Sequence, residues 1–217
     1  MTAEVMACGE YHYFENGVRC NIVEPWSISR GVEGELQVIS SRQIADADSE
    51  LTVEATLKAA QQVYDLCWRQ GAAQTRARYV VSSGELTRLT RDGVQESGDY
   101  TFDYFFPLMR VFTGPLLCAL AANGPAQVLV PWIKNPAQAE KLFTADISER
   151  QVELLEEQGG VRCFSYQGGQ YEQAAKCLVS DCGWLLAYTW EMQSGSHWEV
   201  RLAGSPPEFK CPDLSAV

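Results

Sequence analysis

The sequence predicts a mainly β domain of the α+β class: a single curved antiparallel sheet or half-barrel of about 8–10 strands wrapped over two or three short helices. Three observations lead to this fold class. Apolar and polar residues alternate with a period of two along several segments, turn-forming residues separate these segments, and signals for helices are few. Consecutive hairpins of this kind form an antiparallel meander.

The clearest strand is predicted at 50–58, where Leu51 and Val53 alternate with polar residues, so that one face is apolar and the other polar. Segment 197–202 repeats this pattern. Turn signals lie between most of the remaining candidates. The other segments that we expect to be strands are 22–29, 35–44, 75–81, 85–91, 127–133, 161–166, 171–179 and 184–192.

A surface helix is predicted at 148–158. Ser148 and Gln151 have the spacing of a capping box, and Gly159 follows in the position of a helix C-cap. The apolar stripe of this segment is narrow, and several glutamates flank it. We therefore expect an amphipathic helix that lies on the surface of the sheet.

A second helical region is expected at 107–121, divided into two short pieces by Gly114-Pro115. Segment 137–142 is a candidate for one further helical turn. Segment 60–70 is compatible with a helix or with a long strand, and the sequence leaves both readings open.

The composition indicates one globular domain over residues 1–217, with a flexible tail at 204–217 that contains three prolines. The chain has 17 basic and 28 acidic residues, which gives a formal net charge of −11. A protein of this charge repels phosphate backbones, so nucleic acid is excluded as a partner. The apolar content of 46% is sufficient for a substantial core.

The sequence predicts a cytoplasmic protein that does not span a membrane. Residues 1–20 contain three glutamates and no uninterrupted apolar run, unlike a secretory signal. The most apolar stretch, 104–122, is broken by prolines and Arg110, unlike a membrane-spanning helix. The eight cysteines include no Cys-x-x-Cys pair and are interpreted as free thiols in a reducing compartment.

Signals for catalysis are weak. The chain has only two histidines, which leaves little material for a catalytic triad or a metal site, and we expect no cofactor and no metal. Acidic residues could still act in a cleft if their carboxylates were paired. The candidates for such a hydrolase-type site are Asp99, Asp103 and Asp181.

The most distinctive feature is a concentration of aromatic residues. From Tyr100 to Phe112 the chain is mostly aromatic or aliphatic, with Arg110 as the only cation, and tryptophans recur beyond residue 127. Such a cluster is either an ordinary filled core or the lining of a cavity under a curved sheet. In the second case the candidate ligand-binding residues are Phe102, Tyr104, Phe106, Arg110, Trp132, Tyr188 and Trp190, with Arg110 contacting a polar or anionic head.

Three segments resemble a bacterial family described as glycolipid-binding, whose fold is similar to the lipoprotein carriers of the cell envelope. They are Phe106-Pro107-Leu108-Met109-Arg110, the segment 130–136 around Trp132, and the segment 179–190 around Asp181, Tyr188 and Trp190. The resemblance spans about half of the chain. It implies a curved antiparallel sheet over helices and a non-enzymatic binding protein.

Three functions therefore remain open. The first is a non-enzymatic binding protein with an apolar cavity for a lipid-like or glycolipid-like small molecule, hydrophobic or amphipathic. The second is a protein–protein interaction module, for example a homodimer formed through an aromatic patch. The third is the hydrolase-type enzyme that uses carboxylates in a cleft.

Overall fold

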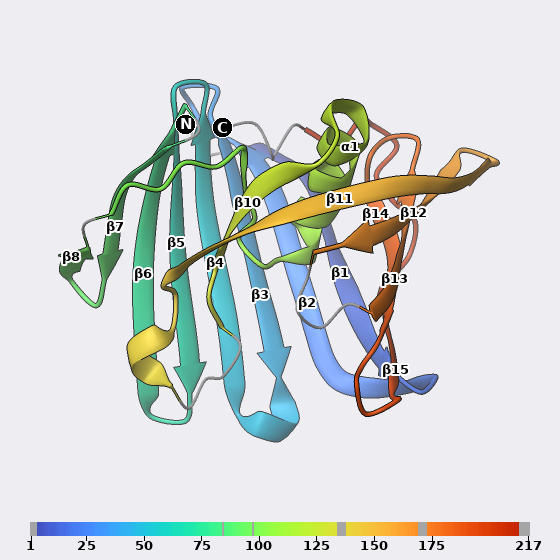
Figure 1. Ribbon diagram of the computed structural model, residues 1–217, viewed down its shortest axis with the longest axis horizontal. Helices are drawn as coiled ribbons and strands as arrows, with labels where there is room; N and C mark the ends of the chain where they lie inside the picture. The colour runs from blue at the N-terminus through green and yellow to red at the C-terminus, as the bar shows by residue number, and fades with distance from the viewer. Residues whose placement is uncertain (1–3, 84, 97, 134–137, 169–172, 213–217) are drawn as a thin grey trace.

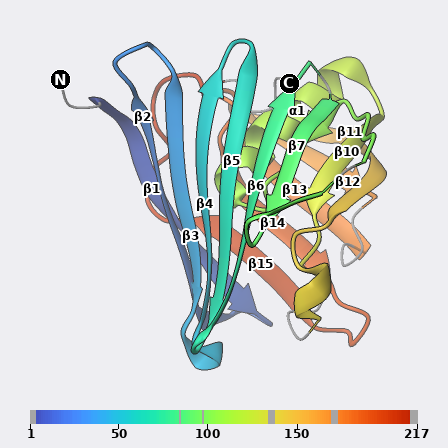
Figure 2. The same cartoon turned by 90° about the vertical axis from the view of Figure 1, so that its left-hand side faces the viewer.

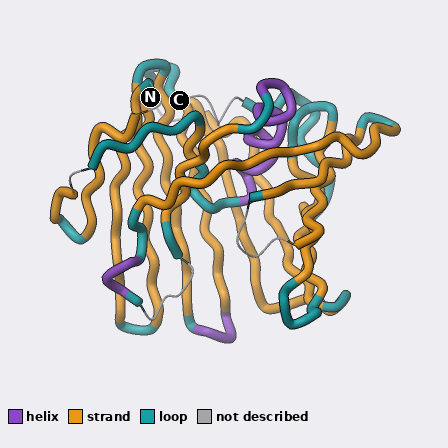
Figure 3. The backbone as a smooth tube through the Cα atoms, in the orientation of Figure 1, coloured by secondary structure: helices purple, strands orange, loops and turns teal. Residues whose placement is uncertain are grey.

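The structure is a computed structural model that describes residues 4–83, 85–96, 98–133, 138–168 and 173–212. Within these residues the chain forms one sheet of fifteen strands, one α-helix and three short 3-10 helices. Figure 3 shows that strand makes up most of the described chain. The mainly β fold class predicted from the sequence is confirmed.

The strands are β1 (Glu4–Glu15), β2 (Val18–Arg30), β3 (Leu36–Ile44), β4 (Ser49–Lys58), β5 (Gln61–Gln70), β6 (Ala73–Ser82), β7 (Glu85–Arg91), β8 (Val94–Glu96), β9 (Tyr104–Phe105), β10 (Ala126–Pro131), β11 (Ala145–Gln158), β12 (Val161–Gln167), β13 (Gln173–Ser180), β14 (Leu185–Glu191) and β15 (His197–Leu202). The helices are η1 (Ala45–Ala47), η2 (Arg110–Phe112), α1 (Thr113–Asn123) and η3 (Ala139–Lys141).

The strand order is β8-β7-β6-β5-β4-β3-β2-β1-β15-β14-β13-β12-β11-β10-β9. The pairing of β9 with β10 is parallel, and the other strand pairings are antiparallel. The first and last strands of the chain, β1 and β15, are paired in the middle of the sheet. Both edges of the sheet therefore come from the middle of the sequence.

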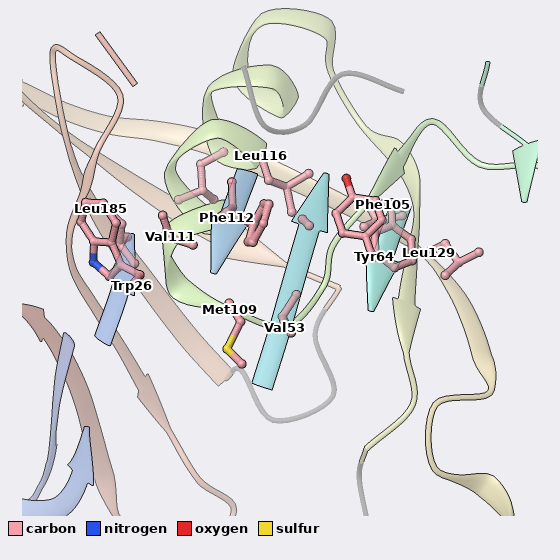
Figure 4. Close-up of a cluster of buried hydrophobic side chains, with 14 of the residues drawn as sticks. Trp26, Val53, Tyr64, Phe105, Met109, Val111, Phe112, Leu116, Leu129 and Leu185 are labelled. Atoms are coloured by element: carbon pink, nitrogen blue, oxygen red, sulfur yellow. The ribbon is translucent and has the colours of Figure 1, made fainter. Parts of the chain in front are cut away.

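The sheet is strongly curved. In Figure 1, β10 and β11 cross in front of the wall formed by β2–β6, and Figure 2 shows β1–β7 side by side as that wall. The edge strand β9 closes over the concave face, because the Phe105 ring lies 4.3 Å from the Tyr64 ring on β5 and 5.0 Å from the Tyr79 ring on β6. Figure 4 shows Tyr64 and Phe105 together in the core. The sheet thus rolls over itself without closing into a barrel.

The period-two pattern explains how the strands bury their inner face. On β4, Leu51 and Val53 are buried whereas Glu54 is exposed, as the alternation predicts. The apolar side of the sheet faces the inside of the curve, where η2 and α1 contribute Val111, Phe112 and Leu116 to the same core (Figure 4).

Five strands were not assigned as strands from the sequence. They are β1, β5, β8, β9 and β11, and they account for the difference between the expected ten strands or fewer and the observed fifteen. The alternation in β1 is interrupted by two register shifts, between Val5 and Ala7 and between His12 and Phe14, which removes the period-two signal there. The ambiguous segment 60–70 is a strand, β5.

The helix predicted at 148–158 was wrong, because this segment is the strand β11. Its first part, 145–150, pairs with β10, and its second part, 151–158, pairs with β12. The Ser148 hydroxyl accepts a hydrogen bond from the Arg150 Nε–H at 3.0 Å. Gly159 and Gly160, with φ of 59° and 77°, form the turn of the β11–β12 hairpin, so the glycine interpreted as a helix cap is a turn residue. Strand pairing, with β10 and then with β12, overrides the local helix signal.

The helical region 107–121 also differs from the prediction. Gly114-Pro115 does not break α1 but lies in its first turn, where proline needs no backbone N–H partner. A Cβ on Gly114 would lie 2.3 Å from the Gly183 carbonyl oxygen, so glycine allows this close contact with the β13–β14 turn. The helical turn expected at 137–142 is present as η3. No helix within the described residues is long and apolar enough to cross a membrane.

The tail predicted to be flexible from Gly204 contacts the core in its described part. The Trp184 Nε1–H donates to the Phe209 carbonyl oxygen at 2.9 Å, and the Cys211 side chain is buried. Several predicted features fall partly outside the described residues, namely 171–172 of an expected strand, 137 of an expected turn, 134–136 of the second resembling segment and 213–217 of the tail.

Candidate functional site

A cavity of about 410 Å³ lies between the inner face of β10–β15 and the segment 106–117. Its volume lies within the usual range of small-molecule sites, ~300–1,000 Å³. Most of its lining side chains are apolar. The described lining residues are Arg42, Phe106, Leu108, Arg110, Thr113, Leu116, Leu117, Val130, Pro131, Trp132, Ile133, Asp146, Arg150, Tyr166, Cys177, Tyr188, Trp190, Met192 and Trp198.

Two of the seven residues predicted to bind a ligand lie elsewhere. Phe102 is buried in the core, and the Tyr104 hydroxyl on β9 accepts a hydrogen bond from the Asn123 Nδ2–H at 2.8 Å. The other five line the cavity, although they come from three separate parts of the chain: Phe106, Arg110, Trp132, Tyr188 and Trp190. Their role in binding remains a prediction.

Three aromatic rings form a stacked row along one side of the cavity. Tyr188 and Trp190 are two residues apart on β14 and therefore share a face, with ring centroids 4.9 Å apart. Trp198 is the cross-strand partner of Trp190 on β15, and their rings are 5.8 Å apart. Trp198 was not among the predicted site residues, but its alternation with polar neighbours had placed it on the apolar face.

The Arg110 guanidinium lies among aromatic faces. It is 4.6 Å from the Tyr188 ring centroid, 5.5 Å from that of Trp190 and 5.9 Å from that of Tyr13. Its Nε–H donates to the Tyr13 hydroxyl at 3.4 Å, a long contact. Cation–π attraction of this kind is worth ~0.5–2 kcal/mol and holds the cation without neutralising it.

Arg110 is positioned through its backbone by Glu24, a fully buried residue on β2. One oxygen of the Glu24 carboxylate accepts the Arg110 backbone N–H at 2.5 Å. The other accepts the Tyr13 hydroxyl at 2.6 Å and the Arg42 Nε–H at 2.8 Å. Burial raises the pKa of Tyr13 to about 12, so its hydroxyl stays protonated and continues to donate.

Arg42 on β3 also holds the preceding turn. One terminal N–H of its guanidinium donates to the Leu108 carbonyl oxygen at 2.6 Å. Leu108 has a φ of 69°, a left-handed conformation that costs an ordinary residue ~1–3 kcal/mol unless its surroundings hold it. Arg42 and Glu24 together therefore fix the backbone on both sides of Met109 and place Arg110 at the cavity.

Sequence reasoning missed Glu24 and Arg42 because both lie on strands that were only weakly predicted. The sequence did contain a signal for the burial of Glu24, in the alternation of its strand. Trp26 and Ile28 alternate with polar residues, and the same period of two places Glu24 on their inner face. An acidic side chain on the inner face of a strand indicates a buried partner of opposite charge.

The cavity wall formed by β11 and β12 was also missed, because 148–158 had been predicted to be a helix. Asp146 and Arg150 lie four residues apart on β11 and both line the cavity. Arg150 donates to the Tyr166 hydroxyl on β12 at 3.1 Å. This wall adds charged groups of both signs to a largely apolar site.

The carboxylates proposed for a hydrolase are not brought together. Asp99, Asp103 and Asp181 are exposed and do not line the cavity, and an Asp103 oxygen accepts the Gln127 backbone N–H at 2.8 Å. Within the described ranges no three His, Cys, Asp or Glu side chains are grouped so that they could hold a metal ion.

Comparisons with known proteins place the fold without identifying a family. No family model and no curated protein matches the chain. The chain is similar to the crystal structure of a beta-barrel-like protein of a domain of unknown function, DUF1849, from Brucella abortus, with a TM-score of 0.51. The match covers 92% of this chain and 97% of that one at 6% sequence identity. At this identity the likeness shows a shared barrel-like fold alone.

Proposed function

We propose that the protein is a non-enzymatic binding protein that holds a lipid-like or glycolipid-like small molecule in the cavity between β10–β15 and segment 106–117. The observation that carries this proposal is the cavity itself, because several of the aromatic residues line an open pocket of about 410 Å³. An apolar space of this size lined by a few polar groups is typical of a small-molecule site.

The cavity has apolar and polar lining residues, which suits a ligand with an apolar part and a polar part. Leu116, Leu117 and Val130 can offer only apolar contact, which suits a hydrocarbon tail. Arg110 offers N–H donors to a head group. The likeness of three segments to the glycolipid-binding family supports the same class of ligand but does not choose the head group.

The other two functions have less support. The hydrolase needs paired carboxylates in a cleft, and its three candidates are exposed on separate segments. The interaction module needs a contiguous apolar patch. Of the most strongly exposed aliphatic residues, Val5 and Val18 lie at opposite ends of the β1–β2 pair, Val32 follows β2, and Val94 lies on the edge strand β8.

Native mass spectrometry of the protein purified from its own host tests the proposal. We expect a monomer with an additional mass that is lost on denaturation and that organic extraction recovers as an amphipathic small molecule. A monomer with no additional mass that also fails to take up a neutral apolar probe would contradict the proposal. A dimer with no additional mass would favour the interaction module.

A further inference from the structure

We infer that the ligand carries a single negative charge on an oxygen-bearing head, and that Arg110 and Thr113 bind this head together. The inference rests on the proposed function, because it names the chemistry of the head group at the same cavity. It follows from the charges that surround the cavity and from one buried hydroxyl.

Among the described residues that line the cavity, the positive charge of one arginine is not balanced by a carboxylate. Arg42 is compensated by the buried Glu24 carboxylate, with which it forms an ion pair at 2.8 Å. Arg150 and Asp146 line the cavity with opposite formal charges, which cancel. Arg110 remains, and among the described residues no carboxylate lies within ion-pair distance of its guanidinium.

The position of Arg110 makes this uncompensated charge significant. The chain as a whole has a formal charge of −11. A cavity with a net positive charge therefore contrasts with the charge of the protein as a whole. The Arg110 guanidinium is packed against Tyr188 and Trp190, and π faces replace little of the lost hydration. A cavity ligand that brings one negative charge restores neutrality there, whereas a cation adds repulsion.

Thr113 supplies a second polar group at the same place. It lies three residues after Arg110, at the η2–α1 junction, so the two side chains are neighbours on one helical face. Thr113 is 7% exposed and lines the cavity. Its hydroxyl is buried and has no hydrogen-bond partner within the described part of the chain.

An unsatisfied buried hydroxyl is unfavourable, and an acceptor oxygen on the ligand would remove the penalty. The Thr113 oxygen has almost no accessible surface, so it reaches the cavity after a rotation about its Cα–Cβ bond. Threonine has two accessible rotamers in helices, which makes this rotation inexpensive. A carboxylate then accepts from Arg110 with one oxygen and from Thr113 with the other.

A matched series of single-chain amphiphiles tests the head group on the full-length protein. N-phenyl-1-naphthylamine, a neutral fluorescent probe, reports occupancy of the cavity, and each amphiphile displaces it below its micellar concentration. Dodecanoate, dodecyl phosphate, dodecanol and dodecyltrimethylammonium share one tail and differ in the head. We expect dodecanoate to bind about tenfold or more tightly than dodecanol, since hydrogen bonds to charged groups are the strong ones.

Variants assign this preference to the two residues. Arg110→Met should make the affinities for dodecanoate and dodecanol equal within about twofold while dodecanol still binds. Thr113→Val, which keeps the shape of the side chain, should lower the dodecanoate preference about threefold. Arg88→Met removes an exposed arginine on the outer side of β7, causes the same change in net charge and should leave the preference intact. Circular dichroism verifies that each variant is folded. If Arg110→Met is unfolded, Arg110→Gln is used in its place.

The outcomes separate this inference from the proposed function. If dodecanol or the ammonium compound binds as tightly as dodecanoate, the inference is wrong while the binding function stands. If dodecyl phosphate binds more tightly than dodecanoate, the head is a phosphate-type oxyanion at the same two residues. If none of the four displaces the probe, or if the probe itself does not bind, both fail.

Discussion

The buried carboxylate of Glu24 accepts a hydrogen bond from the backbone N–H of Arg110, a residue 86 positions further along the chain. The same carboxylate forms an ion pair with Arg42, which in turn holds the Leu108 carbonyl oxygen. The wall formed by β2 and β3 therefore sets the conformation of the segment that carries Arg110. The position of Arg110 at the cavity and the packing of β2 against β3 therefore depend on this one acidic residue.

Glu24→Gln should destabilise the protein strongly. The substitution keeps the size of the side chain but leaves Arg42, whose side chain is 17% exposed, without its counter-charge. Breaking a buried ion pair in this way costs roughly 3 kcal/mol in the free energy of unfolding. Urea unfolding followed by tryptophan fluorescence measures it.

Asp65→Asn is the matched control for Glu24→Gln. It breaks the ion pair with Arg78 on the outer face of the sheet, where the two side chains are 44% and 58% exposed. An exposed pair of this kind contributes less than about 1 kcal/mol. Equal destabilisation by the two substitutions would show that the Glu24 pair has no special role.

Val130→Trp should abolish binding of the neutral probe by filling the cavity. Val130 is half-buried and lines the cavity at the end of β10. The larger indole occupies the space that a ligand tail would use, so we expect at least about a tenfold loss of probe affinity with little change in the unfolding midpoint. Fluorescence titration and thermal unfolding give the two quantities.

Thr189→Trp is the control for the added volume. Thr189 lies between Tyr188 and Trp190 on β14, so its side chain points to the opposite face of the sheet. Probe affinity should be unchanged in this variant. A comparable loss in both variants would mean that the probe does not occupy the cavity.

Trp190→Leu should weaken the binding of dodecanoate more than that of dodecanol. The Trp190 ring lies 5.5 Å from the Arg110 guanidinium and keeps it in place. Loss of one cation–π contact should reduce dodecanoate affinity roughly three- to tenfold. Probe displacement measures both ligands.

Trp132→Leu removes a tryptophan that lines the cavity and makes no cation–π contact with Arg110. It should weaken both ligands by the same factor, because it changes apolar contact alone. If Trp190→Leu also acts equally on both ligands, the Trp190 ring does not position Arg110.

Tyr13→Phe should reduce the loss of stability at alkaline pH. The pKa of Tyr13 is raised by burial from 10.0 to about 12 in the folded protein. Deprotonation is therefore easier in the unfolded chain. The Tyr13 contribution, roughly 3 kcal/mol, is present in full below pH 10 and is lost as the pH rises toward 12.

Urea midpoints between pH 8 and pH 11.5 measure this effect. The wild-type curve should fall more steeply than that of Tyr13→Phe, although both should fall, because burial also raises the pKa of Tyr11 and Tyr79. Parallel curves for the two proteins would contradict the prediction.

Local sequence signals were reliable where a strand had one apolar and one polar face. Segment 50–58 is included in β4 and segment 197–202 is β15, as the alternation predicted. The same reasoning failed for β1, where bulges interrupt the alternation, and for β11, where a short capping pattern imitated a helix start. A capping box is a contact within one turn, and it cannot report that β10 pairs with the first part of the strand and β12 with the rest.

The sequence by itself determined that this is a mainly β protein whose aromatic residues are concentrated at 100–112, with Arg110 as the only cation there, and beyond residue 127, because periodicity and composition are properties of the chain. The tertiary structure alone decided that Glu24 and Arg42 meet beneath Arg110, and that Asp146 and Arg150 enter the cavity wall. It also decided which aromatic residues line a pocket and which fill the core. The alternation of apolar and polar side chains predicts which face of a strand is buried. The curvature of the whole sheet, in contrast, sets the volume inside the curve that these side chains have to fill.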